Sequence, residues 1–174
     1  RVYYVSNVSN GGNSRIFSVR TDGSDETLEV ALDFNIGSPE LSPDGQLVAF
    51  QRGVDADGHT DMFTIRLDGS ALTRLTTRES WSYHPSWSSD GSRIAFAAGV
   101  IWIMNADGSG LTNLHTGGRG AWIPAWSPDG QWIAFERIES DDAHRIYLVH
   151  PDGSELTRVS PESETQDLVP IWVP

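Results

Sequence analysis

Residues 124–135 read PAWSPDGQWIAF, and two other stretches of the chain repeat this unit with small changes. Residues 39–50 read PELSPDGQLVAF, and residues 85–96 read PSWSSDGSRIAF. The three copies begin 46 and 39 residues apart. A period of about 40–45 residues that holds several strands is typical of a propeller blade. The repeat therefore predicts an all-β propeller.

Each repeat contains four short segments, which we name strands A to D in chain order. Strand A carries the Pro-x-Trp motif and ends at a Ser-Pro-Asp-Gly turn. Strand B alternates large apolar residues with smaller or polar ones, which is the period of a strand. An Asp-Gly-Ser turn joins strands C and D, where glycine supplies the positive φ and aspartate bonds its own backbone. The copies of strand B are residues 1–6, 47–52, 93–98 and 132–137; strand C is residues 15–19, 61–65, 100–104 and 145–149; strand D is residues 27–31, 72–75, 111–114 and 156–159.

The chain as a whole predicts one domain of four blades with four antiparallel strands each. Residues 170–174 repeat strand A, while the chain begins at strand B, so the first blade is expected to combine the two ends. Pro174 would then lie one tight turn away from Arg1. Four blades fall within the usual range for such rings. The predicted blades are residues 170–174 plus 1–38, then 39–84, 85–123 and 124–169.

The composition narrows the classes of partner. The formal net charge is −12, which argues against nucleic acid or an anionic membrane as a partner. No run of eighteen apolar residues is present, so no membrane insertion is expected. The absence of cysteine excludes disulfides and thiolate metal sites. Arg1 already lies within a strand pattern, which indicates a processed or trimmed start and no remaining signal peptide.

The repeat Pro-x-Trp-Ser-Pro-Asp-Gly-x-x-Ile-Ala-Phe, followed by Asp-Gly-Ser and Leu-Thr, resembles the TolB-type β-propeller repeat. Similar repeats occur in periplasmic TolB, in the tricorn protease and in the propellers of some prolyl peptidases. The resemblance covers essentially the whole chain. It implies a protein-interaction, scaffolding or gating module outside the bacterial cytoplasm, periplasmic or secreted. Because the repeats occupy the sequence from Arg1 onward, we expect neither the separate N-terminal domain of TolB nor a hydrolase domain within these residues.

One loop contains alternating carboxylates that resemble part of a calcium loop. Asp55, Asp57 and Asp61 are the weak candidate ligands, with Gly58 at the turn. The first ligand of the usual pattern would fall on Gly53, which has no side chain, and the other repeats lack the motif. We therefore expect a solvated hairpin, no tight calcium site and no cofactor.

Catalytic signals are absent from the sequence. There is no Gly-x-Ser-x-Gly motif, and the five histidines show no metal-ligand spacing. The chain is therefore expected not to be an enzyme. Asn7 begins a short glycosylation sequon, a pattern that also arises by chance.

The predicted propeller has two unlike faces. One face consists of short Asp-Gly turns, and the other carries the B–C and D–A loops, which vary in length and are the usual place for binding residues. We call the second one the loop face and expect a protein or a glycan to bind there, although its rings could instead close the top of the core. A third alternative is a strand-exchanged homo-oligomer or fibre built through residues 170–174. The candidate binding residues are Trp81, Tyr83, His84, His115, Arg119 and Trp122.

Overall fold

The computed structural model describes residues 1–7, 13–77, 81–161 and 169–173, and these contain strands without helices. Among them, no helix is long and apolar enough to span a membrane. The strands are β1 (Val2–Asn7), β2 (Ser14–Val19), β3 (Thr27–Ala31), β4 (Gly37–Leu41), β5 (Leu47–Gly53), β6 (Thr60–Arg66), β7 (Thr73–Arg74), β8 (Tyr83–Trp87), β9 (Arg93–Ala98), β10 (Val100–Asn105), β11 (Thr112–Asn113), β12 (Gly120–Trp126), β13 (Ile133–Ile138), β14 (His144–Val149) and β15 (Thr157–Arg158).

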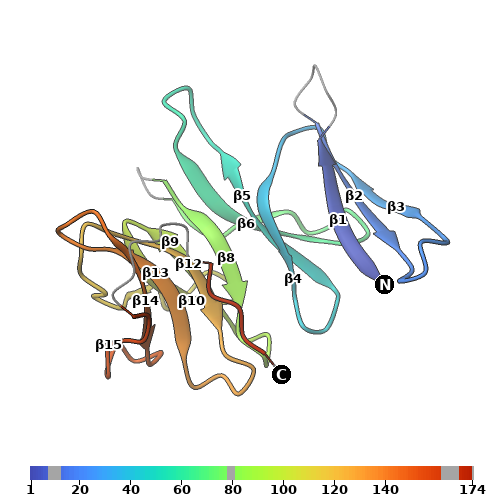
Figure 1. The fold of residues 1–174 in the computed structure, drawn as a ribbon. Helices are drawn as coiled ribbons and strands as arrows, with labels where there is room; N and C mark the ends of the chain where they lie inside the picture. The colour runs from blue at the N-terminus through green and yellow to red at the C-terminus, as the bar shows by residue number, and fades with distance from the viewer. Residues whose placement is uncertain (8–12, 78–80, 162–168, 174) are drawn as a thin grey trace.

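The strands form four antiparallel sheets in chain order, which we call blades 1 to 4. Blade 1 pairs β1-β2-β3, and blades 2, 3 and 4 pair β4 to β7, β8 to β11 and β12 to β15. Figure 1 shows the four sheets fanning out in an arc, from β1 at one end to blade 4 at the other. This architecture confirms the all-β fold and the count of four blades. The register follows the repeat, since Leu41, Trp87 and Trp126 pair with Val48, Ile94 and Ile133.

The repeated aspartates cap turns, as the sequence predicts. In each Asp-Gly-Ser turn, the carboxylate accepts hydrogen bonds from the N–H and the hydroxyl of the serine two residues later. These bonds stabilise the charged form and lower the pKa of the carboxyl. The glycine that follows takes a positive φ, 83° at Gly23 and 85° at Gly153. The carboxylates of this face are therefore occupied by their own turns.

The hydrophobic core lies between successive blades rather than at one centre. Three clusters of buried side chains occupy the three junctions. At each junction a phenylalanine of strand B is fully buried, and these are Phe50, Phe96 and Phe135. The strand-A residue Trp87 belongs to the cluster between blades 2 and 3, and Trp126 to the one between blades 3 and 4. Apolar packing between neighbouring blades thus determines the position of each sheet.

The predicted closure of blade 1 by residues 170–174 is wrong for the described residues. There, β1 pairs with β2, and residues 169–173 form no strand with it. The indole Nε1 of Trp172 instead donates to the carbonyl of Ala125 in β12, at 2.9 Å. Trp87 makes the equivalent bond to the carbonyl of Glu40 in β4, at 3.2 Å. Residues 169–173 therefore contact blade 4 in the way that strand A of a following blade would. They lie away from β1 (Figure 1).

Candidate functional site

A β-bulge at the start of each strand A shapes the loop face. The ladders of β4, β8 and β12 with their neighbours shift register just before the strand-A proline. The residue before that proline has a positive φ in all three blades: 45° at Ser38, 52° at His84 and 50° at Ile123. Such angles are uncommon for residues other than glycine and costly for a branched one. A bulge re-aims the side chain that it carries, so these three positions are set by the fold.

Tyr83 and Trp122 form an aromatic pair across blades 3 and 4. Their ring centroids are 5.7 Å apart with an interplanar angle of 36°. Both side chains are half-buried, and Trp122 also packs against the core cluster between these blades. The sequence predicted both residues at this face, and the structure brings them together. The pair offers part of its aromatic surface to solvent while its other side covers the core.

His84 lies beside the aromatic pair in a polar setting. Its Nδ1 is 3.1 Å from the hydroxyl of Ser38 on blade 2, and its ring centroid is 6.2 Å from that of Tyr83. The backbone N–H of His84 donates to the side-chain oxygen of Gln51, at 3.3 Å. Burial lowers the pKa of His84, and the charge of Glu136 opposes this fall. His84 is thus favoured in its neutral form, able to both donate and accept a hydrogen bond.

Two polar residues of this site were not predicted from the sequence. Gln51 and Glu136 follow the buried phenylalanines of strand B at the same position of the repeat, on blades 2 and 4. Glu136 is 6 % exposed, and its carboxylate lies 2.6 Å from Nδ1 of His144. A charged residue at a buried position of an otherwise apolar strand is the signal that could have identified Glu136. Its carboxylate lies near the aromatic pair, since Glu136 is the ladder partner of Trp122.

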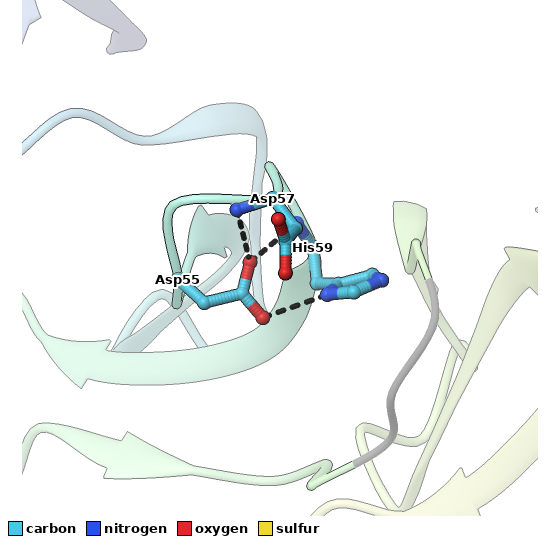
Figure 2. Close-up of side chains that lie close together, drawn as sticks. All are labelled: Asp55, Asp57 and His59. Atoms are coloured by element: carbon cyan, nitrogen blue, oxygen red, sulfur yellow. Dashed lines mark hydrogen bonds and ion pairs between the residues drawn. The ribbon is translucent and has the colours of Figure 1, made fainter.

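Trp81 forms a second part of the loop face together with the B–C loop of blade 2. Its side chain is 51 % exposed, its backbone makes a β-bridge with Thr60, and its ring centroid lies 5.3 Å from that of His59. Figure 2 shows His59 held by Asp55, whose other oxygen accepts the backbone N–H groups of Asp57 and His59. The hydrogen bond with His59 lowers the pKa of the Asp55 carboxyl. The loop therefore presents an exposed indole on an ordered support.

The three predicted calcium ligands do not come together. Asp61 is fully buried, and its carboxylate accepts hydrogen bonds from Thr76 and from the guanidinium of Arg74. Asp61, one of the three weak candidates, therefore lies outside the group formed by Asp55 and Asp57, because the start of strand β6 turns its side chain into the blade. The ligand atoms of Asp55, Asp57 and His59 lie within 4.8 Å of one another. The hydrogen bonds within the turn account for this grouping.

The two remaining predicted residues lie apart from the aromatic pair. Arg119 is exposed and pairs with the carboxylate of Asp142 in the next loop. His115 is also exposed, and its backbone N–H donates to Asn113 at 2.6 Å. Among the described residues, no hydrogen bond or ring contact joins His115 or Arg119 to His84 or Trp122. The predicted set of six therefore divides into an aromatic pair with His84, an exposed Trp81, and two peripheral residues.

The sequence matches no protein-family model and no curated protein. The structure, however, resembles solved propellers. Putative TolB from Agrobacterium tumefaciens superposes with a TM-score of 0.75 and 26 % identity, over 92 % of this chain and 58 % of that chain. TolB from Acinetobacter baumannii superposes with a TM-score of 0.72 and 17 % identity, over 92 % of this chain and 41 % of that chain. The chain therefore has a β-propeller fold similar to that of these TolB proteins. It spans about half the length of these TolB chains.

This TolB-like propeller also resembles propellers of other kinds. A chain of a nidogen/laminin complex superposes with a TM-score of 0.72 at 12 % identity, over 92 % of this chain and 61 % of the other. A chain of oligogalacturonate lyase in complex with manganese superposes with a TM-score of 0.65 at 19 % identity, over 90 % of this chain and 49 % of the other. At such identities the likeness shows the fold alone. Similar propeller folds thus occur both in a protein complex and in an enzyme.

Proposed function

We propose that this TolB-like propeller is a non-catalytic module that binds another protein through its loop face, outside the cytoplasm. The observation that carries the proposal is the exposed indole of Trp81, supported from below by His59, on the same face as the Tyr83–Trp122 pair. Aromatic residues anchor protein interfaces because they bury a large area with little loss of side-chain freedom. The opposite face carries turns whose aspartates are already hydrogen-bonded to neighbouring serines.

The kinds of neighbour support a protein partner and the extracytoplasmic location. Two of the similar structures are TolB proteins, and a third comes from a nidogen/laminin complex. The sequence repeat resembles the same periplasmic family. The overall charge of −12 favours a partner that presents basic or neutral polar groups.

A glycan is the second candidate, favoured by the same aromatic surface. The rings of Trp81, Tyr83 and Trp122 offer flat apolar faces next to hydrogen-bonding groups of His84 and Ser38. Sugars bind such combinations through stacking and hydrogen bonds. A structural role in a strand-exchanged assembly would use the ends of the arc, and it is compatible with binding at the loop face.

Replacement of Trp81 tests the proposal. Because Trp81 is half exposed, Trp81→Ala is expected to leave the melting temperature nearly unchanged, while partner binding weakens by about 2 kcal/mol or more. Binding is measured by quantitative capture from an extracytoplasmic extract, in parallel with a glycan array. The matched control is Trp132→Ala, which removes a half-buried indole of the turn face whose ring centroid lies 3.8 Å from that of His150.

The outcomes separate the alternatives. A protein captured by the wild type and by the Trp132→Ala variant, but not by Trp81→Ala, supports the proposal. Glycan binding lost in the same pattern would favour the second candidate. If Trp81→Ala captures the same proteins in the same amounts, or if it unfolds the chain, the assignment of this face is wrong.

A further inference from the structure

Blade 4 carries an arginine at the position where blade 2 carries a buried carboxylate. Asp61 is the second residue of β6 and lies opposite Arg52 in the ladder. Arg145 is the second residue of β14 and lies opposite Arg137. We infer that the place that Asp61 fills in blade 2 is, in blade 4, a binding site for a carboxylate group from outside the chain. This site is separate from the loop-face residues described above and does not depend on their role.

Blade 2 shows which group this position of the repeat accepts. The carboxylate of Asp61 is fully buried, and it accepts hydrogen bonds from the guanidinium of Arg74 and from the hydroxyl of Thr76. The Nε of Arg74 also donates to the carbonyl of Thr76 at 3.0 Å, which orients the guanidinium. Charged donors of this kind compensate a buried carboxylate for its lost hydration. The position is therefore built around a carboxylate.

Blade 4 keeps the donors of this arrangement and replaces the acceptor. Arg158 is the counterpart of Arg74, and its Nε donates at 3.0 Å to the carbonyl of the residue two positions later, as the Nε of Arg74 does. With Arg145 at the place of the aspartate, three arginines share one face of the sheet, and they are Arg137, Arg145 and Arg158. Like charges directly opposite one another in a ladder are destabilising. A bound carboxylate would relieve this repulsion.

Two of the three arginines line a polar hollow of about 480 Å³. The lining residues are Glu139, Ser140, Asp141, Arg145, Tyr147 and Arg158. The Nη1 of Arg145 donates to the carbonyl of His144 at 3.1 Å, but its Nε is buried and has no hydrogen-bond partner within the described part of the chain. Buried donors without an acceptor are rare and costly. This N–H therefore indicates a missing acceptor at the hollow.

The two carboxylates of the hollow are engaged elsewhere. Glu139 accepts a hydrogen bond from the hydroxyl of Tyr147 and lies 3.6 Å from the guanidinium of Arg137. Asp141 accepts the backbone N–H of Ala143 within its own turn, at 3.1 Å. Three guanidinium groups and two carboxylates leave an excess of one positive charge here, in a chain whose net charge is −12. The hollow therefore favours one carboxylate over a polyanion, which the rest of the molecule would repel.

The hollow belongs to a complete junction between two described blades. Tyr147 packs against the core cluster between blades 3 and 4, and its ring centroid lies 6.0 Å from that of Phe135. The guanidinium carbon of Arg137 lies 4.5 Å from the centroid of the Tyr147 ring. Such a contact holds the guanidinium in place before a ligand arrives. Arginine binds a planar carboxylate through two parallel N–H···O bonds, so the donors of this site suit a carboxylate in particular.

Three small anions test the site directly. N-acetylaspartate amide represents an acidic side chain of a protein, succinate represents a free dicarboxylate, and inorganic phosphate is the comparison at equal ionic strength. We expect a carboxylate probe to shift the Nε–H NMR signal of Arg145 saturably, and to leave that of Arg74 unchanged because Arg74 already bonds to Asp61. Binding of N-acetylaspartate amide assigns the site to a protein carboxylate, and binding of succinate alone assigns it to a small free one. Phosphate bound more tightly than both, or no saturable binding, would overturn the inference.

Variants of Arg145 provide the second test. Arg145→Gln should weaken binding of the carboxylate probe about fivefold or more, since it removes a charged donor. The control Arg119→Gln, at an exposed arginine paired with Asp142, should bind the probe as the wild type does.

Arg145→Asp rebuilds the arrangement of blade 2. It should raise the melting temperature by several degrees and abolish probe binding, because a carboxylate of the chain then occupies the site. A folded Arg145→Gln variant that binds the probe as tightly as the wild type would overturn the inference. An Arg145→Asp variant that melts at or below the wild-type temperature would do so too.

Discussion

Single carboxylates in this protein take different roles because their surroundings differ. The aspartates of the turn face are exposed and hydrogen-bonded to serines, and these bonds lower the pKa of their carboxyls, to about 2 at Asp90. Glu40 sits in strand β4 between blades, where burial raises the pKa of its carboxyl to about 7. Its oxygen accepts the N–H of Trp87, which opposes the rise. The bonds of the turn aspartates contribute stability that is lost only as the pH falls below the ordinary range of aspartate, whereas Glu40 makes stability depend on pH near neutrality.

Glu40→Gln is expected to stabilise the protein above pH 7. The folded-state pKa lies above the ordinary value of 4.5, so the folded protein binds this proton more tightly than the unfolded chain does. The stabilisation that protonated Glu40 provides is fully present below the ordinary pKa and is lost as the pH rises through about 7. Glutamine keeps the acceptor for Trp87 without the charge. The free energy of unfolding should therefore rise by about 1–3 kcal/mol at pH 8 and change little at pH 4. An equal effect at both pH values, in urea titrations, would contradict this account.

Removal of calcium is expected to leave the protein unchanged. Asp61 is engaged with Arg74 and Thr76, and Asp55 is engaged with its own turn, so few free oxygens remain for an ion. A chelator should shift the melting temperature by less than about 1 °C, because only an ion bound to the folded state would raise it by mass action. A shift of several degrees that Asp57→Ala abolishes would show a site in the loop after all.

Strand A is the element that connects each blade to the blade before it. Its tryptophan packs into the junction with the preceding blade, and the indole of Trp87 bonds to the backbone of the strand A before it. Its bulge orients Ser38, His84 and Ile123 at the loop face. The same element therefore links the core to the candidate binding surface.

Trp87→Ala is expected to lower the free energy of unfolding by about 3–5 kcal/mol, since it leaves a large cavity between blades 2 and 3 and removes a hydrogen bond. Trp172→Ala should cost clearly less in the monomer, because the segment around Trp172 is largely exposed and packs against one blade only. Both values come from chemical denaturation of the isolated chain. An equal loss of unfolding free energy in the two variants would contradict the view that burial between two blades determines how much each tryptophan stabilises the fold.

The strands, the turns and the blade count could be predicted from the sequence because each depends on local chemistry. Asp-Gly-Ser specifies its turn, and alternation in strand B specifies which residues are buried, as Phe50 and Phe96 show. The pairing of Tyr83 with Trp122 follows from their equivalent positions in adjacent repeats. Asp61 was assigned to the wrong environment, because motif spacing does not show which way a side chain points at the start of a strand. Glu136 was missed, because its position beside Trp122 and His144 follows from the pairing of strands β12, β13 and β14 and not from a local motif.

The arrangement of the blades in space is the property that the repeat did not determine. Closure by residues 170–174 required a particular angle between blades, and that angle depends on side-chain packing at every junction. The structure instead places Trp172 on blade 4 and leaves β1 at the other end of the arc (Figure 1). The described residues thus present two unlike faces, the loop face and the capped turn face.

The central claim is that a partner binds the loop face. It is tested most directly by measuring amide hydrogen exchange of this chain with and without the captured partner. The account predicts slower amide exchange in residues 53–60, 81–84 and 120–123 when the partner is bound, and no change in the turns at residues 43–46 and 89–92. Protection confined to those turns, or to strand β1 and residues 169–173, would place the partner elsewhere and contradict the claim.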